Sequence, residues 1–197
     1  MQDSPTERFQ IVAVAASAGG VHALTTLLSG LDGDFPLPVL AVQHLDPRHR
    51  TVLADILDRR TEITVKLAEH DEPVRPGTVY LAPPDRHLLV SPDRTLALSR
   101  SELVHFLRPS ADLLFESVAG TYGAGALAVV LTGTGSDGAM GADAVKARGG
   151  TVIAQDPQTA EFSGMPEAAV RTGAVDFVLP LEEISAVVRG LVQAEKQ

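Results

Sequence analysis

Short apolar runs rich in β-branched residues alternate along most of this chain with segments whose apolar residues recur at the helical period. The runs that predict strands are 11–16, 39–43, 78–82, 126–132, 151–155 and 176–179. Between most of them lie predicted helices, one of which begins after Ser110 as its N-cap. Near-continuous apolar strands separated by helices are typical of a parallel sheet buried on both faces. We therefore expect an α/β fold with a doubly wound, mainly parallel sheet and helices on both faces.

The middle of the chain departs from this alternation. Its short β-like runs are joined by turns that combine Pro with Gly or Asp. These runs are 63–67, 78–81, 87–91 and 95–98. They predict a β-hairpin-rich insertion at an edge of the sheet. The chain has 197 residues, of which 45% are hydrophobic, so we expect one domain over 11–193 after a short tail, 1–10.

The residue inventory excludes several classes of function. The chain contains no cysteine, which excludes a disulfide framework, a thiol nucleophile and a cysteine-based zinc site. Its formal net charge of −9 argues against nonspecific nucleic-acid binding, which requires a basic surface. The histidines show no close metal-ligand spacing, so we expect no metal site. We find no apolar signal segment and no run of membrane-spanning length, and so expect a soluble, cytoplasmic protein without membrane insertion.

Polar residues with complementary chemistry follow three of the predicted strands. Ser17 stands between the first strand and a predicted helix, His44 follows the second strand, and Asp137 lies in the loop after 126–132. Because the carboxyl ends of parallel strands meet at one edge of the sheet, these side chains should share a rim. A helix N-terminus there would favour a developing oxyanion. The pattern predicts Ser17 as nucleophile, His44 as general base and Asp137 as the residue that orients the imidazole.

Each of these residues also has a purely structural interpretation, and spacing alone leaves it open. Ser17 and Asp137 could each cap the helix that follows them, and His44 could be an ordinary loop residue. The segment Ala-Ala-Ser17-Ala-Gly is not the G-x-S-x-G elbow of α/β-hydrolases, and the chain order Ser, His, Asp also differs from theirs.

A dinucleotide site is a competing interpretation of the same rim. The segment 133–138 reads GTGSDG, follows a strand and opens a helix, and Asp156 ends the next strand. This is the dinucleotide-binding fingerprint in its usual context, and it would imply an oxidoreductase. However, Asp137 would place a negative charge beside the pyrophosphate.

Several segments, taken together, are similar to the catalytic domain of the chemotaxis protein-glutamate methylesterase (CheB-type) family. They occur in the family's order and spacing over roughly residues 9–193. The segments are VAASAGG (14–20), VQHL (42–45), RPGTVYLAP (75–83), RPSADLLF (108–115), LTGTGSDGA (131–139), IAQD (153–156), GMP (164–166) and GAVD (173–176). The resemblance implies hydrolysis of γ-glutamyl methyl esters on cytoplasmic chemoreceptor helices, and often deamidation of receptor glutamines, without metal or cofactor. The family's catalytic serine, histidine and aspartate fall on Ser17, His44 and Asp137.

Two residues differ from the pattern of the family this chain resembles. Ala18 replaces a usual threonine and Thr134 a usual methionine, but each keeps a backbone N–H that could serve an oxyanion hole. Only about ten residues precede the first strand, so the resemblance covers the catalytic domain without the family's N-terminal receiver domain. Regulation would then come from elsewhere, or the enzyme would be constitutively open.

An acidic receptor helix would have to dock on a locally basic rim, because this chain is itself acidic. Arg48 and Arg50 follow His44 closely and are weak candidates for that contact, since exposed arginines are more often solvated surface residues. The remaining alternative is an adaptor without enzymatic activity, derived from the methylesterase fold. The sequence does not predict an oligomeric state.

Overall fold

Strands and helices alternate through residues 9–46, 48 and 50–194, the part of the chain that this computed structural model describes. The strands are β1 (Ile11–Ala16), β2 (Val39–Gln43), β3 (Thr64–Leu67), β4 (Thr78–Leu81), β5 (His87–Val90), β6 (Leu96–Ser99), β7 (Ala126–Val130), β8 (Thr151–Gln155) and β9 (Phe177–Leu179). The helices are α1 (Gly20–Ser29), α2 (Leu53–Arg60), α3 (Ala111–Tyr122), α4 (Ala139–Ala147), α5 (Gly164–Arg171) and α6 (Leu181–Gln193), with a 3-10 turn, η1 (Gly123–Gly125).

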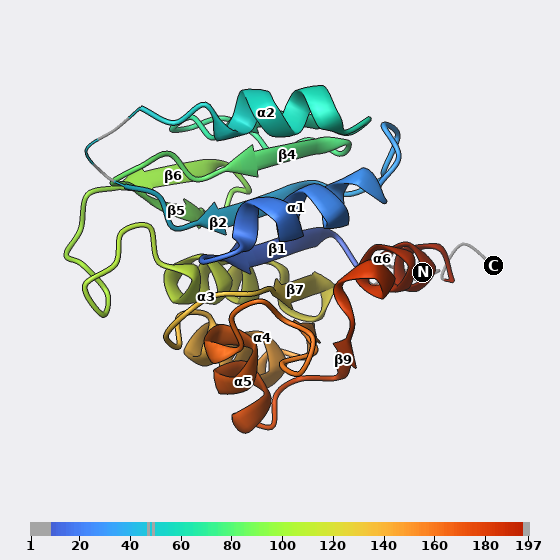
Figure 1. Cartoon of the computed structure of the whole chain (residues 1–197). Helices are drawn as coiled ribbons and strands as arrows, with labels where there is room; N and C mark the ends of the chain where they lie inside the picture. The colour runs from blue at the N-terminus through green and yellow to red at the C-terminus, as the bar shows by residue number, and fades with distance from the viewer. Residues whose placement is uncertain (1–8, 47, 49, 195–197) are drawn as a thin grey trace, which may run out of the picture.

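Within the described residues, seven strands form one parallel sheet in the order β3-β4-β2-β1-β7-β8-β9. The chain winds outward from β1 in one direction through β2, and later in the other direction through β7 and β8 (Figure 1). The loops that leave β1 and β7 therefore diverge at the centre of the sheet. The doubly wound parallel fold predicted from the apolar runs is confirmed.

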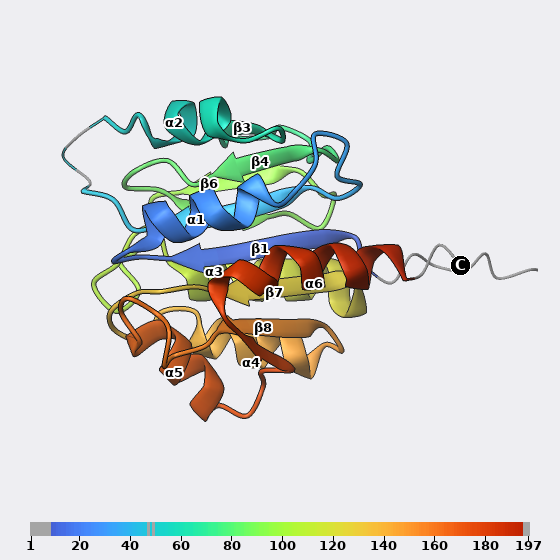
Figure 2. The ribbon, with the colours of Figure 1, turned by 45° about the vertical axis from the view of Figure 1, so that its right-hand side comes forward.

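Alternate residues of β1 pack into two separate cores, one on each face of the sheet. Val12, Val14 and Ala16 join the core formed with α1, α2 and α6. Ile11, Ala13 and Ala15 join the core formed with α3, α4, α5 and the β5–β6 hairpin. Figures 1 and 2 show α1 and α6 on one side of the sheet and α3 and α4 on the other. Burial of each large aliphatic side chain stabilises the fold by about 1.5–3 kcal/mol, so burial on two faces requires the near-continuous apolar strands seen in the sequence.

The predicted β-hairpin-rich insertion is present but smaller than the sequence indicates. Among the strands of the described residues, only β5 and β6 pair antiparallel, and Val90 N of this hairpin donates to Ser117 Oγ of α3 at 3.0 Å. The β4 strand belongs to the main sheet, as the run 78–82 also predicted, and β3, which was expected only in the insertion, pairs parallel with it. The Pro76-Gly77 turn suggested a hairpin, yet Gly77 N donates to Leu37 O at 3.3 Å, just before β2. That tertiary contact places β4 next to β2. The residues of the turn alone do not predict it.

Among the described helices, none is long and apolar enough to cross a lipid bilayer. The division into a tail (1–10) and one domain (11–193) stays a prediction, and residues 1–8 of that tail lie outside the described part of the chain.

Candidate active site

The three candidate catalytic residues follow strands at the centre of the sheet. Ser17 follows β1, His44 follows β2, and Asp137 lies between β7 and α4. Because β1 pairs with both β2 and β7, all three lie beyond the carboxyl ends of adjacent parallel strands. At β1 and β7 the connections leave in opposite directions, one toward β2 and the other toward β8. Open α/β sheets bind ligands at such a point. The arrowheads of β1 and β2 mark this edge in Figure 1.

Ser17 begins a tight turn between β1 and α1. Gly20 N donates to Ser17 O at 2.7 Å, and Gly19 has φ 74° and ψ 0°. These angles match the third residue of a type II turn, about +80° and 0°, where glycine is strongly favoured. The N-cap of α1 is Gly19, with no side-chain capping bond, so Ser17 does not cap the helix. Ser17 is partly exposed, and its hydroxyl is available at the rim.

His44 and Asp137 form a hydrogen-bonded pair across two strands. His44 Nε2 lies 2.8 Å from Asp137 Oδ2, and the two side chains are 15% and 2% exposed. An ionised carboxylate only accepts, so Nε2 carries the hydrogen and the neutral ring keeps Nδ1 as its acceptor. Ser17 follows Ala16 and His44 follows Gln43, which are register partners, so the two residues are neighbours at the strand ends. In the described part of the chain, no hydrogen bond joins the Ser17 hydroxyl to His44.

The carboxylate of Asp137 lies at the N-terminus of α3 rather than capping its own helix, α4. Its Oδ2 accepts Ala111 N at 2.8 Å, and its Oδ1 accepts Asp112 N at 3.0 Å and Ser110 Oγ at 3.3 Å. Burial acts to raise the pKa of Asp137, but the hydrogen bonds from His44, Ala111 and Asp112 outweigh it and hold the pKa below its ordinary value. The carboxylate therefore stays ionised and fixed in orientation.

Asp112 supplies the reciprocal contact from α3 to α4. Its Oδ1 accepts Gly138 N at 3.0 Å and Gly141 N at 2.7 Å, at the start of α4. Burial and the nearby charge of Asp137 raise the pKa of Asp112, against the effect of these two N–H groups. The N-terminus of α3 thus receives the carboxylate of Asp137 from the loop before α4, and the N-terminus of α4 receives that of Asp112 from α3; the helix dipole favours negative charge at both ends. This exchange fixes the loop that carries Asp137 against α3.

Two substitutions at Asp112 should distinguish the effect of its hydrogen bonds on stability from the effect of its charge. In Asp112→Ala both N–H groups of α4 lose a buried acceptor, so we expect a loss of about 2–4 kcal/mol of unfolding free energy. Asp112→Asn keeps the accepting oxygen, so its stability at neutral pH should match or exceed that of the parent. The pKa of Asp112 is raised in the folded parent, so the free energy of unfolding of the parent falls as pH rises through that pKa. The Asp112→Asn variant has no ionisable group at this position and does not lose this stability. Urea unfolding of the parent and the Asp112→Asn variant between about pH 4 and pH 7 tests this prediction. If the free energy of unfolding of the variant fell further below that of the parent at about pH 7 than at about pH 4, the prediction would be contradicted.

A buried histidine supports the same helix end. His87 is fully buried, and its Nδ1 accepts Ser110 N at 3.1 Å while its Nε2 donates to Glu102 O at 2.9 Å. These two bonds fix the ring tautomer and hold Ser110, the N-cap of α3. The sequence did not suggest a role for His87. Its place in the structure is to hold the residues that surround Asp137.

The loop after β7 runs directly against the Ser17 turn. A Cβ at Gly133 would lie 2.8 Å from Ser17 Cβ and 2.3 Å from Met165 Sδ, so no side chain fits there. Thr132 O accepts Ser17 N at 3.0 Å, and Thr132 Oγ donates to Ala18 O at 3.1 Å. Gly133, the first glycine of the supposed dinucleotide fingerprint, therefore serves close packing against the serine turn.

The two proposed oxyanion donors lie on these adjoining loops. Ala18 N and Thr134 N donate to no acceptor among the described residues. Thr134 is exposed and Ala18 is partly exposed, so both backbone groups can be reached from the rim.

The two candidate docking arginines differ in their surroundings. The guanidinium of Arg48 binds Asp46, with Nη2 to Oδ2 at 3.0 Å and Nε to Oδ1 at 3.1 Å. Arg50 instead lines a mostly apolar cavity of about 300 Å³ beside the rim, together with Val21, Leu45, Val52 and Ile56. Arg50 forms no ion pair within the described residues.

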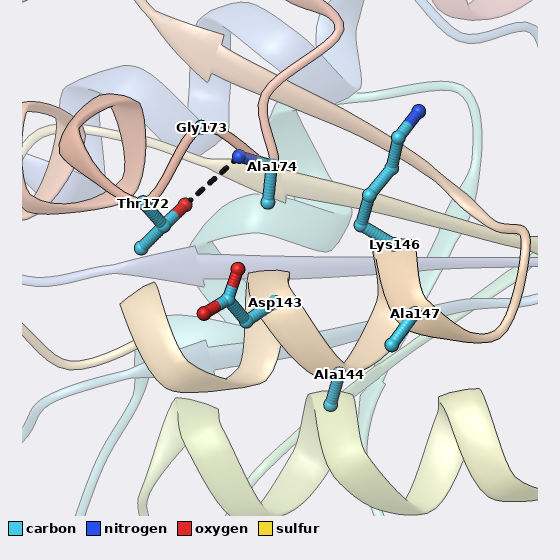
Figure 3. Close-up of a pocket in the computed structure, with 7 residues that line it drawn as sticks. All are labelled: Asp143, Ala144, Lys146, Ala147, Thr172, Gly173 and Ala174. Atoms are coloured by element: carbon cyan, nitrogen blue, oxygen red, sulfur yellow. Dashed lines mark hydrogen bonds between the residues drawn. The ribbon is translucent and has the colours of Figure 1, made fainter.

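A larger cavity, of about 500 Å³, lies away from these residues, between α4 and the segment after α5 (Figure 3). It is lined mainly by small residues with Asp143, Lys146 and Thr172, and Thr172 Oγ accepts Ala174 N at 3.1 Å. It contains none of the candidate catalytic residues.

Sequence reasoning missed the residues that hold Asp137, namely His87, Ser110 as a partner of Asp137, and Asp112. Their common signal is polarity at fully or nearly fully buried positions. That signal exists only once burial is known, because each of them lies in a segment that also predicts an ordinary turn or helix start.

Comparison with known proteins matches most of the chain to one family. The profile of the CheB methylesterase family matches residues 12–188. A relative from Leptospira interrogans is 41% identical over 177 residues, covering 90% of this chain and 92% of that protein. The protein-glutamate methylesterase FrzG of Myxococcus xanthus is 41% identical over 182 residues, covering 92% of this chain but 54% of FrzG.

A solved structure agrees with these sequence relatives. The crystal structure of the Thermotoga maritima CheB methylesterase catalytic domain matches with a TM-score of 0.88 at 38% identity, over 94% of this chain and 98% of that chain. The matched profile includes the strand ends that carry Ser17, His44 and Asp137. On these grounds the chain belongs to the CheB methylesterase family.

Proposed function

We propose that this chain hydrolyses γ-glutamyl methyl esters on the cytoplasmic helices of methylated chemoreceptors, and that it also deamidates receptor glutamines. The observation that carries the proposal is the His44–Asp137 pair, 2.8 Å apart, at the strand ends beside Ser17. A histidine whose Nε2–H is held by a buried carboxylate presents Nδ1 as a base. With a neighbouring serine, that arrangement supports acyl transfer. Because such a substrate lies in the cytoplasm, the enzyme would act there.

In the first half of the reaction, Ser17 Oγ attacks the ester carbonyl carbon while His44 Nδ1 takes the hydroxyl proton. The Oγ–C bond forms, and the former carbonyl oxygen becomes an oxyanion held by Ala18 N–H and Thr134 N–H. Each such donor contributes about 3 kcal/mol to the stability of the transition state. Collapse breaks the bond to the methoxy oxygen, which receives the proton from His44 and leaves as methanol.

In the second half, His44 takes a proton from water, and the hydroxyl oxygen attacks the acyl carbon. The bond to Ser17 Oγ breaks, Oγ regains its proton from His44, and glutamate is released. Glutamine would follow the same route, with ammonia as the leaving group in place of methanol. Asp137 stabilises the imidazolium that forms in each half, because its depressed pKa keeps it ionised.

The direct test measures methanol released from radiolabelled methylated receptor. In parallel, an alkyl fluorophosphonate is added and the adduct is located by mass spectrometry. Methanol release together with an adduct on Ser17 is the expected result. An adduct without methanol release would contradict the substrate, whereas no adduct would favour the adaptor alternative. Binding of a nicotinamide dinucleotide, measured by calorimetry, would favour the oxidoreductase alternative.

We also propose that Arg50 docks the acidic receptor helix, since it borders the apolar cavity beside the rim. Arg50→Glu should raise the KM for receptor by about three- to fivefold, the effect of one exposed charge, and the difference should shrink at high salt. Turnover of a small neutral ester should not change. Arg59→Glu, in the last turn of α2, is the matched control. Equal KM values for the two variants would contradict the docking role.

A further inference from the structure

Gln43 is a buried amide that touches both catalytic strand ends. It is the last residue of β2 and is 5% exposed. Its Nε2 donates to Ser17 O at 2.9 Å and to His44 O at 3.2 Å. One side-chain amide therefore bridges the main chain of the proposed nucleophile and that of the proposed base, just beyond the last register pair of β1 and β2.

The contact to Ser17 O determines the orientation of the following peptide unit. In a trans peptide the C=O of one residue and the N–H of the next point in opposite directions. Ser17 O is drawn inward by Gln43 Nε2 and by Gly20 N. The N–H of Ala18 must then point the other way, and it has no acceptor in the described residues.

We propose that Gln43 is a positioning residue for catalysis, which holds the Ser17–Ala18 peptide so that Ala18 N–H faces the developing oxyanion. The inference rests on the proposed function of Ser17 and His44. The same amide holds the two strand ends at a fixed separation, so the serine and the imidazole stay within reach of each other. It also keeps two carbonyl oxygens turned toward the amide, where they do not repel the oxyanion.

The other end of the amide indicates that the bridge has a purpose beyond packing. Gln43 Oε1 is buried and accepts from no donor in the described residues. A flipped amide would place this oxygen against two carbonyl oxygens, so the hydrogen-bond network assigns the orientation. A Cβ at Gly20 would lie only 1.9 Å from Oε1, so the first residue of α1 leaves room for the amide. An apolar side chain of the same length would fill this space without an unpaired buried oxygen.

The experiment compares Gln43→Met with the parent, because methionine has a similar length and no donor. We expect kcat for methanol release to fall by about 10- to 100-fold with KM changed less than about twofold, since an oxyanion donor acts mainly in the transition state. The rate of Ser17 modification by a fluorophosphonate should fall by a similar factor. Val39→Ala, at the opposite end of β2, is the control for lost stability, and it should retain the parent kcat.

A second variant disturbs the Gln43 amide by a substitution at Gly20 rather than at Gln43 itself. In Gly20→Ala the new methyl group collides with Gln43 Oε1 and displaces the amide, so kcat should fall as in Gln43→Met. In the double variant Gly20→Ala with Gln43→Ala, the severe collision with the amide is relieved and a 2.9 Å contact with Ala16 Cβ remains, but the bridge is absent. Thermal stability should then recover in part relative to Gly20→Ala while kcat stays low. Recovery of kcat along with stability would overturn the proposal.

The outcomes separate this inference from the proposed function. If the parent releases methanol and Gln43→Met matches its kcat, the positioning role is wrong and the function stands. If the parent releases no methanol but Gln43→Met slows the modification of Ser17 by about tenfold or more, the substrate is wrong and the positioning role stands. A rise in KM with an unchanged kcat would also overturn the role assigned to Gln43.

Discussion

Ser17→Ala is expected to reduce methanol release from methylated receptor by about 10⁶-fold, to the limit of detection. The variant loses the proposed nucleophilic oxygen, and the chain contains no cysteine whose thiol could take its place. Stability should change by less than about 0.5 kcal/mol, since the Ser17 hydroxyl makes no hydrogen bond in the described residues. Rates with labelled receptor and urea unfolding curves provide both measurements.

The matched control for this substitution is Ser29→Ala, at the other end of α1. Ser29 is exposed and distant from the rim, so its variant should retain the parent rate. Receptor binding by Ser17→Ala should also be retained, because the serine side chain contributes chemistry rather than contact area. Activity of Ser17→Ala within tenfold of the parent would exclude the proposed nucleophile.

Asp137→Asn should lower kcat by about 10⁴-fold. The carboxylate accepts bonds from His44, Ala111, Asp112 and Ser110, but an amide offers only one accepting oxygen. If that oxygen keeps its bonds to Asp112 N and Ser110 Oγ, the new NH₂ faces Ala111 N–H and His44 Nε2. His44 then has to carry its hydrogen on Nδ1, and the proposed base for Ser17 is lost.

The same substitution should cost about 1–3 kcal/mol of stability, because Ala111 N–H loses its buried acceptor. The sign of the pH dependence follows from the depressed pKa of Asp137. The stabilisation it contributes is complete above the unfolded-state pKa and is lost as pH falls through the folded-state pKa. The stability gap between parent and variant should therefore narrow in acid, which urea titrations across acidic pH can measure.

Asp112→Asn is the control for this second prediction, because it makes the same chemical change in the neighbouring carboxylate. Asp112 accepts both of its bonds through Oδ1 alone, so asparagine can reproduce them. We expect its kcat to stay within about threefold of the parent, since Asp112 acts on the reaction only through Asp137. A loss as large as that of Asp137→Asn would mean that negative charge near α3, rather than the tautomer of His44, accounts for the effect.

The fold was largely predictable because burial on both faces of a sheet leaves a direct mark on the sequence. The β1, β2 and β8 strands run over the predicted residues, since a fully buried strand is apolar along its whole length. The assignment of β3 to the main sheet was not predictable, and the β4 run was assigned both to that sheet and to the insertion. Their sequences are compatible with a hairpin, and the tertiary pairing of β4 with β2, together with the contact of Gly77 with Leu37, shows that they enter the main sheet in parallel.

The positions of the three candidate residues at the rim were predictable from the sequence, but the residues that orient them were not. Ser17, His44 and Asp137 each follow a strand, and parallel strands end at one edge, so sequence position alone brings them to one rim. The residues that orient them come from elsewhere in the chain. Asp137 is held by the start of α3, Ser110 by His87, and Ser17 O by Gln43.

By itself, the sequence determined the α/β class, the rim and the three residues on it, because periodic burial and strand ends are properties of local sequence. Only the tertiary structure decided which groups those residues face. It turned Asp137 away from α4 and toward α3, and it set the amide of Gln43 between two strand ends. The physical reason is that a hydrogen bond between distant segments depends on how two packed layers meet, and no single segment encodes that geometry.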